Sequence, residues 1–243
     1  MNLITFKKHF SLFKKKVKIM DNEDLLKRYN TGTTTVGIKI KDAVVLLADK
    51  RVTMGNYILS RQISKIVPIA KHLAITLAGA VGDNQLLARW LSIEAEQYER
   101  EQERPIPPKA AVTLLANILS SSRYFPYWVM NLLAGYDYVE QKPYLFSIDL
   151  IGGITEEKIA SSGSGSLIAF GILDDLYRED MNVEDAIALG VKAINSSVKR
   201  DSASGDGIDI FVITKYGGKF VEFSKKEIVK EEKKEEKEVK KRK

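Results

Sequence analysis

The sequence predicts an α+β fold in which two sheets pack face to face, with helices on the outside. The expected elements come in groups: strands, two helices, strands, two helices and final strands. Sheets that alternate with helix pairs favour this layered arrangement. The first strands are too apolar to keep one face in water, so both faces of their sheet should be covered. Residues 33–224 contain no internal linker and no repeat, so we expect one domain there.

The strands of the first group are short apolar runs separated by polar connections. The pairs Lys41-Asp42 and Lys71-His72 are the expected turns of two hairpins. The expected strands are residues 34–40, 43–49, 65–70 and 73–78.

A helical period follows, with apolar side chains recurring at core spacing. Asp83 is expected to cap the first helix, and the prolines of residues 105–108 end it. The Ser/Gly stretch at residues 161–166 leads straight into an apolar run, so we interpret it as a loop before a helix. The expected helices are residues 83–104, 110–121, 167–176 and 182–199, and the later strands are 127–135, 143–150, 208–213 and 220–223.

Composition removes several kinds of site. The chain has no cysteine, which excludes disulfides, thiolate metal sites and a cysteine nucleophile and is compatible with a reducing cytoplasm. There are two histidines, of which His9 lies in the leader, so a histidine-rich metal site is not available. His72 is expected to be an exposed turn residue. Apolar residues make up 44% of the chain, as in a globular protein with a core, and no apolar run is long enough to cross a bilayer.

The net charge of +6 comes from the two ends of the chain. Residues 1–32 hold eight Lys/Arg against three Asp/Glu, and residues 225–243 hold ten against six. The body between them therefore carries a net charge of −3. A nucleic-acid binder should carry its basic surface on the folded domain, so we expect no nucleic-acid partner.

The leader and the tail differ from the body. In residues 1–20, phenylalanines and a valine recur at helical spacing among lysines, which fits an amphipathic helix on a membrane surface or a segment that packs on a partner and is then removed. Residues 225–243 are mostly Lys and Glu and are expected to form a mobile tail.

A single stretch, residues 30–37 (NTGTTTVG), divides the leader from the body. Gly32 and the threonines after it fit a turn before an edge strand. They also fit a processing site. Cutting between Gly32 and Thr33 would leave a threonine with a hydroxyl nucleophile and a free α-amine, and that amine can act as its own base.

Such a threonine needs a lysine near its amine, a carboxylate to hold the lysine, small hydroxyls and a glycine turn. Asp49 ends an expected strand, Lys65 begins another, and Gly79 lies in a turn. Each also has an ordinary interpretation: Asp49 in a surface turn, Lys65 as an exposed strand start, and the polar loop residues as helix or turn caps. The further candidates from polar loops are Ser164, Asp201 and Ser204.

Six motifs in order along the chain resemble those of proteasome β subunits of the archaeal type. They cover nearly the whole body, and six motifs in register are highly specific. The motifs are residues 32–37 (GTTTVG), 49–53 (DKRVT), 64–66 (SKI), 78–83 (AGAVGD), 163–166 (GSGS) and 200–205 (RDSASG).

The resemblance implies an N-terminal-nucleophile hydrolase: a four-layer αββα sandwich of two antiparallel sheets flanked by helix pairs. Residues 1–32 would be a propeptide removed by autocleavage between Gly32 and Thr33, residues 33–224 the catalytic domain, and residues 225–243 the tail. The implied catalytic roles are Thr33 as nucleophile, Lys65 as the group that lowers the pKa of the amine, Asp49 as its partner, Gly79 as oxyanion donor, and Ser164, Asp201 and Ser204 as groups that orient the amine or its water. Val52, Ile63, Val67, Leu77 and Val81 would line the pocket for the residue before the cut, which favours hydrophobic residues there. Thr53 would pair its backbone with the substrate strand.

The resemblance also implies partners. Seven-membered β rings would stack in pairs between α-subunit rings, and an ATP-dependent unfoldase cap would feed unfolded proteins to a closed chamber in the cytoplasm. No cofactor, metal or membrane is implied. Two alternatives stay open: a non-catalytic or conditionally processed subunit of a mixed β ring, and a membrane-surface protein that uses the basic leader.

Overall fold

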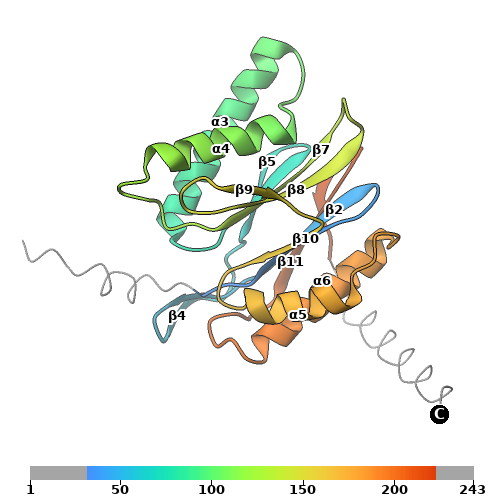
Figure 1. The fold of residues 1–243 in the computed structure, drawn as a ribbon. Helices are drawn as coiled ribbons and strands as arrows, with labels where there is room; N and C mark the ends of the chain where they lie inside the picture. Colours follow the sequence, from blue (N-terminus) through green and yellow to red (C-terminus); the bar gives the residue numbers. More distant parts are fainter. Residues whose placement is uncertain (1–31, 223–243) are drawn as a thin grey trace, which may run out of the picture.

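The computed structural model describes residues 32–222. Within that range, twelve strands and four α-helices follow one another from β1 to β12 (Figure 1). Ten of the strands form two antiparallel sheets and the other two form a small hairpin. The predicted α+β class with two antiparallel sheets is therefore confirmed.

The first sheet has the strand order β10-β1-β2-β11-β12, and every pair of neighbours is antiparallel. All seven residues of its central strand, β2, are buried. The bounds are β1 (Thr35–Lys39), β2 (Ala43–Asp49), β10 (Ile159–Ser162), β11 (Ile208–Thr214) and β12 (Gly217–Phe220).

The second sheet has the order β5-β6-β7-β8-β9, again antiparallel throughout. The separate hairpin consists of β3 (Val52–Met54) and β4 (Tyr57–Ser60). The strands of the second sheet are β5 (Ile66–Ala70), β6 (Leu73–Thr76), β7 (Asn131–Asp137), β8 (Lys142–Ile148) and β9 (Ile154–Glu156).

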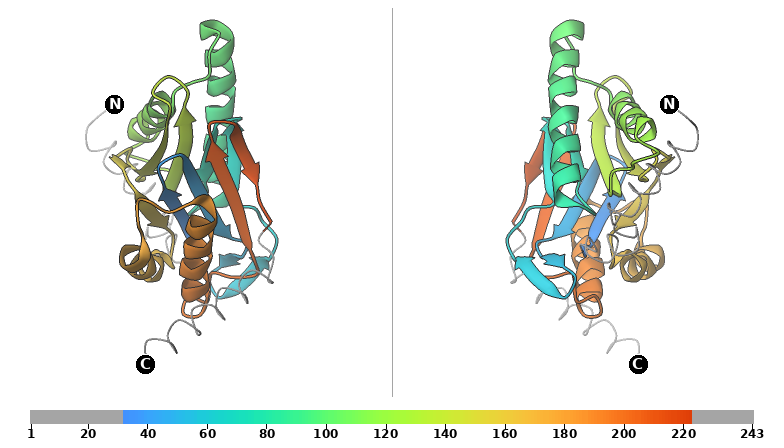
Figure 2. Two further views of the ribbon diagram at one scale, coloured as in Figure 1. Left: turned by 90° about the vertical axis from the view of Figure 1, so that its right-hand side faces the viewer. Right: turned by 90° about the vertical axis from the view of Figure 1, so that its left-hand side faces the viewer.

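Two pairs of helices lie on opposite sides of the strands (Figures 1 and 2). The helices α3 (Val81–Gln102) and α4 (Pro108–Ser121) share a buried apolar cluster with the second sheet. The helices α5 (Ser166–Leu176) and α6 (Val183–Val198) share another with the first sheet.

The packing of β2 explains why this strand is apolar up to its last residue, Asp49. Val45 and Leu47 belong to the cluster with α5 and α6, whereas Val44 and Leu46 belong to a third cluster that also contains Leu132 of the second sheet. Successive side chains of a strand point to opposite faces, so a strand that is covered on both sides needs apolar residues at every position. The expectation that both faces of this strand are covered is therefore confirmed.

Two residues differ from their expected roles. Helix α3 begins at Val81, and Asp83 lies within its first turn, where its carboxylate accepts a hydrogen bond from the backbone N–H of Trp128 at 2.9 Å. His72 is buried rather than exposed, because its Nε2 lies 2.7 Å from the carbonyl oxygen of Ile106 and its ring packs against Tyr138. Asp83 therefore ties α3 to the segment before β7, and His72 ties the turn between β5 and β6 to the segment before α4.

The sequence patterns missed the β3–β4 hairpin and strands β9 and β10. These strands are three or four residues long, and β9 is fully exposed, so they carry little alternating signal. Residues 161 and 162, interpreted as loop, belong to β10. Strand β7 begins at Asn131 instead of residue 127, and β12 ends at Phe220, where the last strand was expected to begin.

The predictions of an amphipathic leader helix at residues 1–20 and of a mobile tail at 225–243 lie outside the described residues. Among residues 32–222, none of the helices combines the length and apolar character needed to cross a membrane.

Candidate active site

Thr33 lies two residues before β1, where three strands of the first sheet meet. Thr35 is paired with Ala48 of β2 on one side and with Ser162 of β10 on the other. The segment before β1 therefore runs between the end of β2, which carries Asp49, and the loop after β10. Only 3% of Thr33 is exposed.

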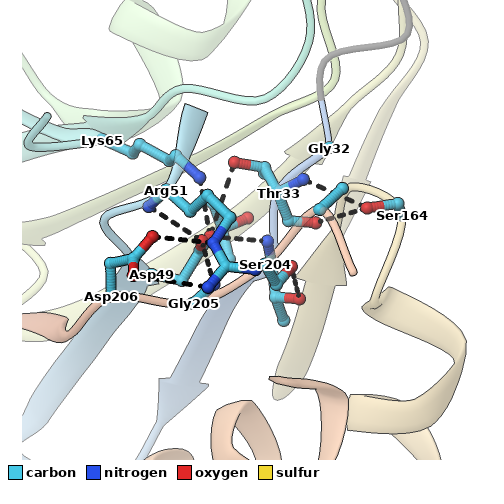
Figure 3. Close-up of polar contacts among 12 residues, drawn as sticks. Gly32, Thr33, Asp49, Arg51, Lys65, Ser164, Ser204, Gly205 and Asp206 are labelled. Carbon is cyan, nitrogen blue, oxygen red and sulfur yellow. Dashed lines mark hydrogen bonds and ion pairs between the residues drawn. The ribbon is translucent and has the colours of Figure 1, made fainter. Parts of the chain in front are cut away.

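The carboxylate of Asp49 is the centre of the polar cluster (Figure 3). Its Oδ1 accepts hydrogen bonds from the Lys65 ammonium at 2.7 Å, the backbone N–H of Thr34 at 2.9 Å and the Thr33 hydroxyl at 3.5 Å. Its Oδ2 accepts from the backbone N–H groups of Arg51 at 3.1 Å and Gly205 at 2.9 Å. These five donors compensate for the complete burial of the carboxylate.

Lys65 is buried, which corrects the interpretation of an exposed strand start. Its side chain is 5% exposed and lies immediately before β5, so the lysine reaches from the second sheet to Asp49 of the first. Burial lowers the pKa of Lys65 below the usual lysine value, and the contact with Asp49 acts in the opposite direction. Asp49 is buried as well, so its interpretation as part of a surface turn is wrong. Its carboxylate provides the counter-charge for the buried lysine.

Three further predicted residues form a hydrogen-bonded chain beside the backbone nitrogen of Thr33. The N–H of Thr33 donates to the hydroxyl of Ser164 at 3.1 Å, and that hydroxyl donates to Asp201 at 2.6 Å. Ser204 donates to the same Asp201 oxygen at 2.7 Å and lies 2.7 Å from the hydroxyl of Thr34. The loops after β10 and α6 thus converge on the atom that would become the amine.

A small pocket opens next to Thr33. The peptide between Gly32 and Thr33 lies at this pocket, and the lining includes apolar side chains from four separate segments. The lining residues are Gly32, Thr33, Val52, Ile63, Ser64, Lys65, Leu77, Gly79, Val81, Asn84 and Gln85.

Of the five residues expected to line a substrate pocket, Val52, Ile63, Leu77 and Val81 meet at this one, and Val67 does not. Val67, in β5, is turned toward the cluster of α3 and α4 and packs there, because strand alternation places it opposite Ile66. Thr53, in β3, instead accepts a hydrogen bond from the N–H of Gly32 through its hydroxyl, at 3.1 Å. Thr53 therefore holds the residue that precedes the expected cut.

Gly79 occupies a backbone conformation that favours glycine. Its φ is +104°, and an added Cβ would collide with the carbonyl oxygen of Trp128. The turn forms an isolated bridge with Val129, so Gly79 is positioned by the segment that enters β7.

The sequence patterns missed a clasp around the cluster. Asp206 receives hydrogen bonds from the guanidinium groups of Arg51, at 2.7 Å, and Arg61, at 2.6 Å, and these contacts lower the pKa of Asp206. Arg51 also donates to the carbonyl oxygen of Ser202 at 2.8 Å. The clasp joins the β2–β3 connection to the loop whose Gly205 contacts Asp49. Arg51 belongs to a motif of the sequence, but nothing in the sequence pairs it with Asp206.

The cluster brings three features together at one peptide bond. They are the hydroxyl of Thr33, the Asp49–Lys65 ion pair and the hydroxyl of Ser164. In the part of the chain that the structure describes, no group of three or more His, Cys, Asp or Glu side chains is arranged to hold a metal ion. The chemistry that this arrangement offers is nucleophilic attack by a threonine.

The geometry defines a class of protein. It is an α+β domain with two antiparallel sheets and a buried Thr–Asp–Lys cluster at the end of one of them. The chain belongs to the proteasome subunit family, whose model, described as "Proteasome subunit", matches residues 29–213. The resemblance seen in the motifs is thereby confirmed.

Relatives in archaea are similar over most of their length. "Proteasome subunit beta" of Archaeoglobus profundus is 52% identical over 198 residues, which cover 81% of this chain and 90% of that protein. "Proteasome subunit beta" of Archaeoglobus fulgidus is 49% identical, covering 81% and 91%. "Proteasome subunit beta 2" of Pyrococcus furiosus is 50% identical over 194 residues, covering 80% and 93%.

Proposed function

We propose that this chain is a catalytic β subunit of a proteasome core particle, a threonine endopeptidase that becomes active when the Gly32–Thr33 bond is cut. One observation carries the proposal. The hydroxyl and the backbone nitrogen of Thr33 each contact a separate polar group, Asp49 with its partner Lys65 on one side and Ser164 on the other. A structural strand end needs neither contact.

Activation begins with the Thr33 hydroxyl oxygen attacking the carbonyl carbon of Gly32. The C–N bond breaks, the nitrogen gains the proton that the hydroxyl loses, and residues 1–32 are left as an ester on the threonine oxygen. Water then hydrolyses the ester and releases the leader with a carboxyl terminus. Thr53 supports this step because its hydrogen bond fixes the backbone of Gly32.

In each later turnover the free amine of Thr33 takes the hydroxyl proton as the oxygen attacks a substrate carbonyl. The unperturbed pKa of an α-amine, about 7.7–8.0, leaves an appreciable neutral fraction near neutrality. The Lys65 cation favours that neutral form by charge repulsion. Asp49 keeps Lys65 in place, and the backbone N–H of Gly79 stabilises the oxyanion.

Ser164, Asp201 and Ser204 act on the amine rather than on the substrate. The hydroxyl of Ser164 accepts from the Thr33 nitrogen and donates to Asp201, which fixes its direction. A directed hydroxyl orients the amine lone pair toward the threonine oxygen. The ammonium formed in the attack then passes its proton to the leaving amine of the substrate. Water enters after the amine product leaves and frees the threonine.

The wider assignment follows the relatives, which are named proteasome β subunits. We propose a four-layer αββα order, with residues 1–32 as propeptide, 33–224 as catalytic domain and 225–243 as tail. The partners are further β subunits in two stacked seven-membered rings, α-subunit rings and an ATP-dependent unfoldase cap. The substrates are unfolded proteins, degraded in the cytoplasm, with cuts after hydrophobic residues because Val52, Ile63, Leu77 and Val81 line the pocket.

Intact mass tests the proposal directly. The full chain is expressed with an α-subunit partner, assembled particles are isolated, and the mass of the β chain is measured with the hydrolysis of a fluorogenic peptide. We expect loss of residues 1–32 and peptide cleavage for the wild-type chain, and neither for Thr33→Ala. Thr33→Ser is the matched control, since it keeps a hydroxyl and should be processed. Assembled particles in which the wild-type chain stays full-length would instead indicate a structural subunit.

A further inference from the structure

The turn around Gly79 is held on one side by backbone hydrogen bonds. The N–H of Ala80 donates to the carbonyl oxygen of Trp128 at 2.7 Å, and the N–H of Met130 donates to that of Ala78 at 3.0 Å. These bonds fix the two residues that flank Gly79 against the segment entering β7. They leave the other side of the turn to be held by α3.

Asn84 provides that second hold. It lies in the first turn of α3, is 1% exposed and reaches back under the turn. Its Nδ2 donates to the carbonyl oxygens of Ala78, at 3.1 Å, and Ala80, at 2.9 Å. One amide group therefore binds the residues on both sides of Gly79.

Asn131 fixes the orientation of Asn84. Its Nδ2 donates to Oδ1 of Asn84 at 2.8 Å and to the carbonyl oxygen of Thr76 at 2.7 Å. Because Oδ1 of Asn84 accepts this bond, its Nδ2 must face the two carbonyls of the turn. The arrangement leaves no choice of amide orientation, since the opposite one would set oxygen against oxygen.

Ordinary packing does not account for this pair. Asn131 is 2% exposed, and within residues 32–222 its Oδ1 is the buried side-chain polar atom without a hydrogen-bond partner. A buried acceptor without a partner is unfavourable, so an apolar residue would suit this site better if only packing mattered. A helix end likewise needs at most the bond from Asn84 to Ala80, which lies four residues back, and not the bond to Ala78.

We propose that Asn84, locked in place by Asn131, is a positioning residue that fixes the backbone N–H of Gly79 for the oxyanion. The inference rests on the proposed function, because it assigns the turn a role in a reaction. Asn84 acts through the turn: two polar side chains that do not react hold the peptide whose direction decides how well the developing charge is stabilised. Their contribution belongs to the transition state and not to substrate binding.

The test compares Asn84→Leu and Asn131→Leu with Ser92→Ala in assembled particles containing the α-subunit partner. Leucine keeps the branched shape of the side chain and removes its hydrogen-bonding groups. Ser92 lies on the same helix, where its hydroxyl donates to the carbonyl oxygen of Ala88, at 2.9 Å. Peptide hydrolysis gives kcat and KM, and a peptide aldehyde gives the affinity for a tetrahedral adduct. Hydrogen exchange of the amides of residues 78–82 gives the rigidity of the turn without any reaction.

We expect Asn84→Leu to lower kcat by about 10- to 100-fold, as misplacement of an oxyanion donor does, with KM within about twofold. Aldehyde affinity should fall in proportion to kcat/KM, and exchange at residues 78–82 should become faster. Asn131→Leu should change the same quantities in the same direction but less, and Ser92→Ala should change none.

The two proposals fail in different ways. An active wild-type particle with unchanged kcat and exchange in Asn84→Leu would overturn the positioning role and leave the proposed function intact. A rise in KM as large as the expected fall in kcat would also overturn the positioning role, since that result indicates lost substrate binding. If the wild-type particle is inactive, the proposed function fails, and unchanged exchange at residues 78–82 would then refute the hold on the turn as well. If Asn84→Leu does not fold, Asn131→Leu carries the same outcomes.

Discussion

The hydrogen bonds of Asp49 and Lys65 predict that substituting one partner of this ion pair lowers the free energy of unfolding more than substituting the other. Asp49 accepts hydrogen bonds from three backbone N–H groups besides Lys65. In the described structure, the charge of Lys65 is compensated by its ion pair with Asp49. Asp49→Asn leaves a buried cation without its counter-charge and points an amide at backbone donors. Lys65→Met leaves a carboxylate that keeps its backbone bonds.

The magnitudes follow from the burial of the pair. Removing one partner so that a buried charge is left unpaired costs about 3–5 kcal/mol, which is the expectation for Asp49→Asn. Losing one hydrogen bond to a charged group costs about 1.5–3 kcal/mol, which is the expectation for Lys65→Met. The free energy of unfolding should therefore differ by about 2 kcal/mol between the two variants, which is the difference between the midpoints of these ranges.

Guanidinium unfolding of the full chain, followed by tryptophan fluorescence, measures this difference. All chains carry Thr33→Ala, so that none is processed, and all are compared at one protomer concentration because assembly shifts the apparent stability. The matched controls are Glu179→Gln and Lys158→Met, which make the same changes in an exposed ion pair with side-chain exposures of 71% and 58%. Each control should lose less than about 1 kcal/mol.

Two results would refute the reasoning. If Lys65→Met is as destabilising as Asp49→Asn, the backbone donors do not sustain the carboxylate by themselves. If the exposed control variants lose as much as the buried ones, burial is not the cause of the effect.

Three further predictions concern the same site. Burial lowers the pKa of Lys65 in the folded chain, so the unfolded chain binds more protons between that lowered pKa and about 10.4. The free energy of unfolding of the wild type relative to Lys65→Met should therefore rise with pH across this window. A stability difference between the two chains that does not depend on pH would contradict this. Gly32→Ala should slow leader release at least about tenfold in an intact-mass time course, because its Cβ would collide with Ala203 and displace the peptide, whereas Gly171→Ala, in open space, should process at the wild-type rate. Asp206→Ala opens the arginine clasp and should lower kcat about tenfold with little change in KM; normal turnover would show that backbone contacts alone hold the loop.

Much of the fold was predictable because local patterns carry it. Residues 43–48 are apolar at every position and Asp49 ends the run, and β2 spans residues 43–49 as expected. The helical period likewise predicted the four helices to within a few residues. Prediction failed where strands are short or polar, as in β9 and β10, since their pairing partners rather than their own residues stabilise them.

The chemistry of the candidate site could be predicted from residue types, but the exposure of its residues could not. Lys65 and His72 each looked like surface residues because a charged or polar side chain beside a turn usually is one. Both are buried because a partner from another segment satisfies them: Asp49 for the lysine and the carbonyl oxygen of Ile106 for the histidine. Val67 was expected at the pocket and packs on the helix side, which depends on the pleat of β5.

The sequence by itself determined which groups are available: a threonine after a glycine, a lysine, two aspartates, small hydroxyls and a glycine turn, in an order that resembles one family. Only the tertiary structure decided which of them meet. Antiparallel pairing of β1 with β2 and β10 sets Thr33 between Asp49 and Ser164, which are far apart in the chain. The contact of Asn131 with Asn84 and the clasp around Asp206 likewise join segments that lie far apart in the chain and that no local pattern links.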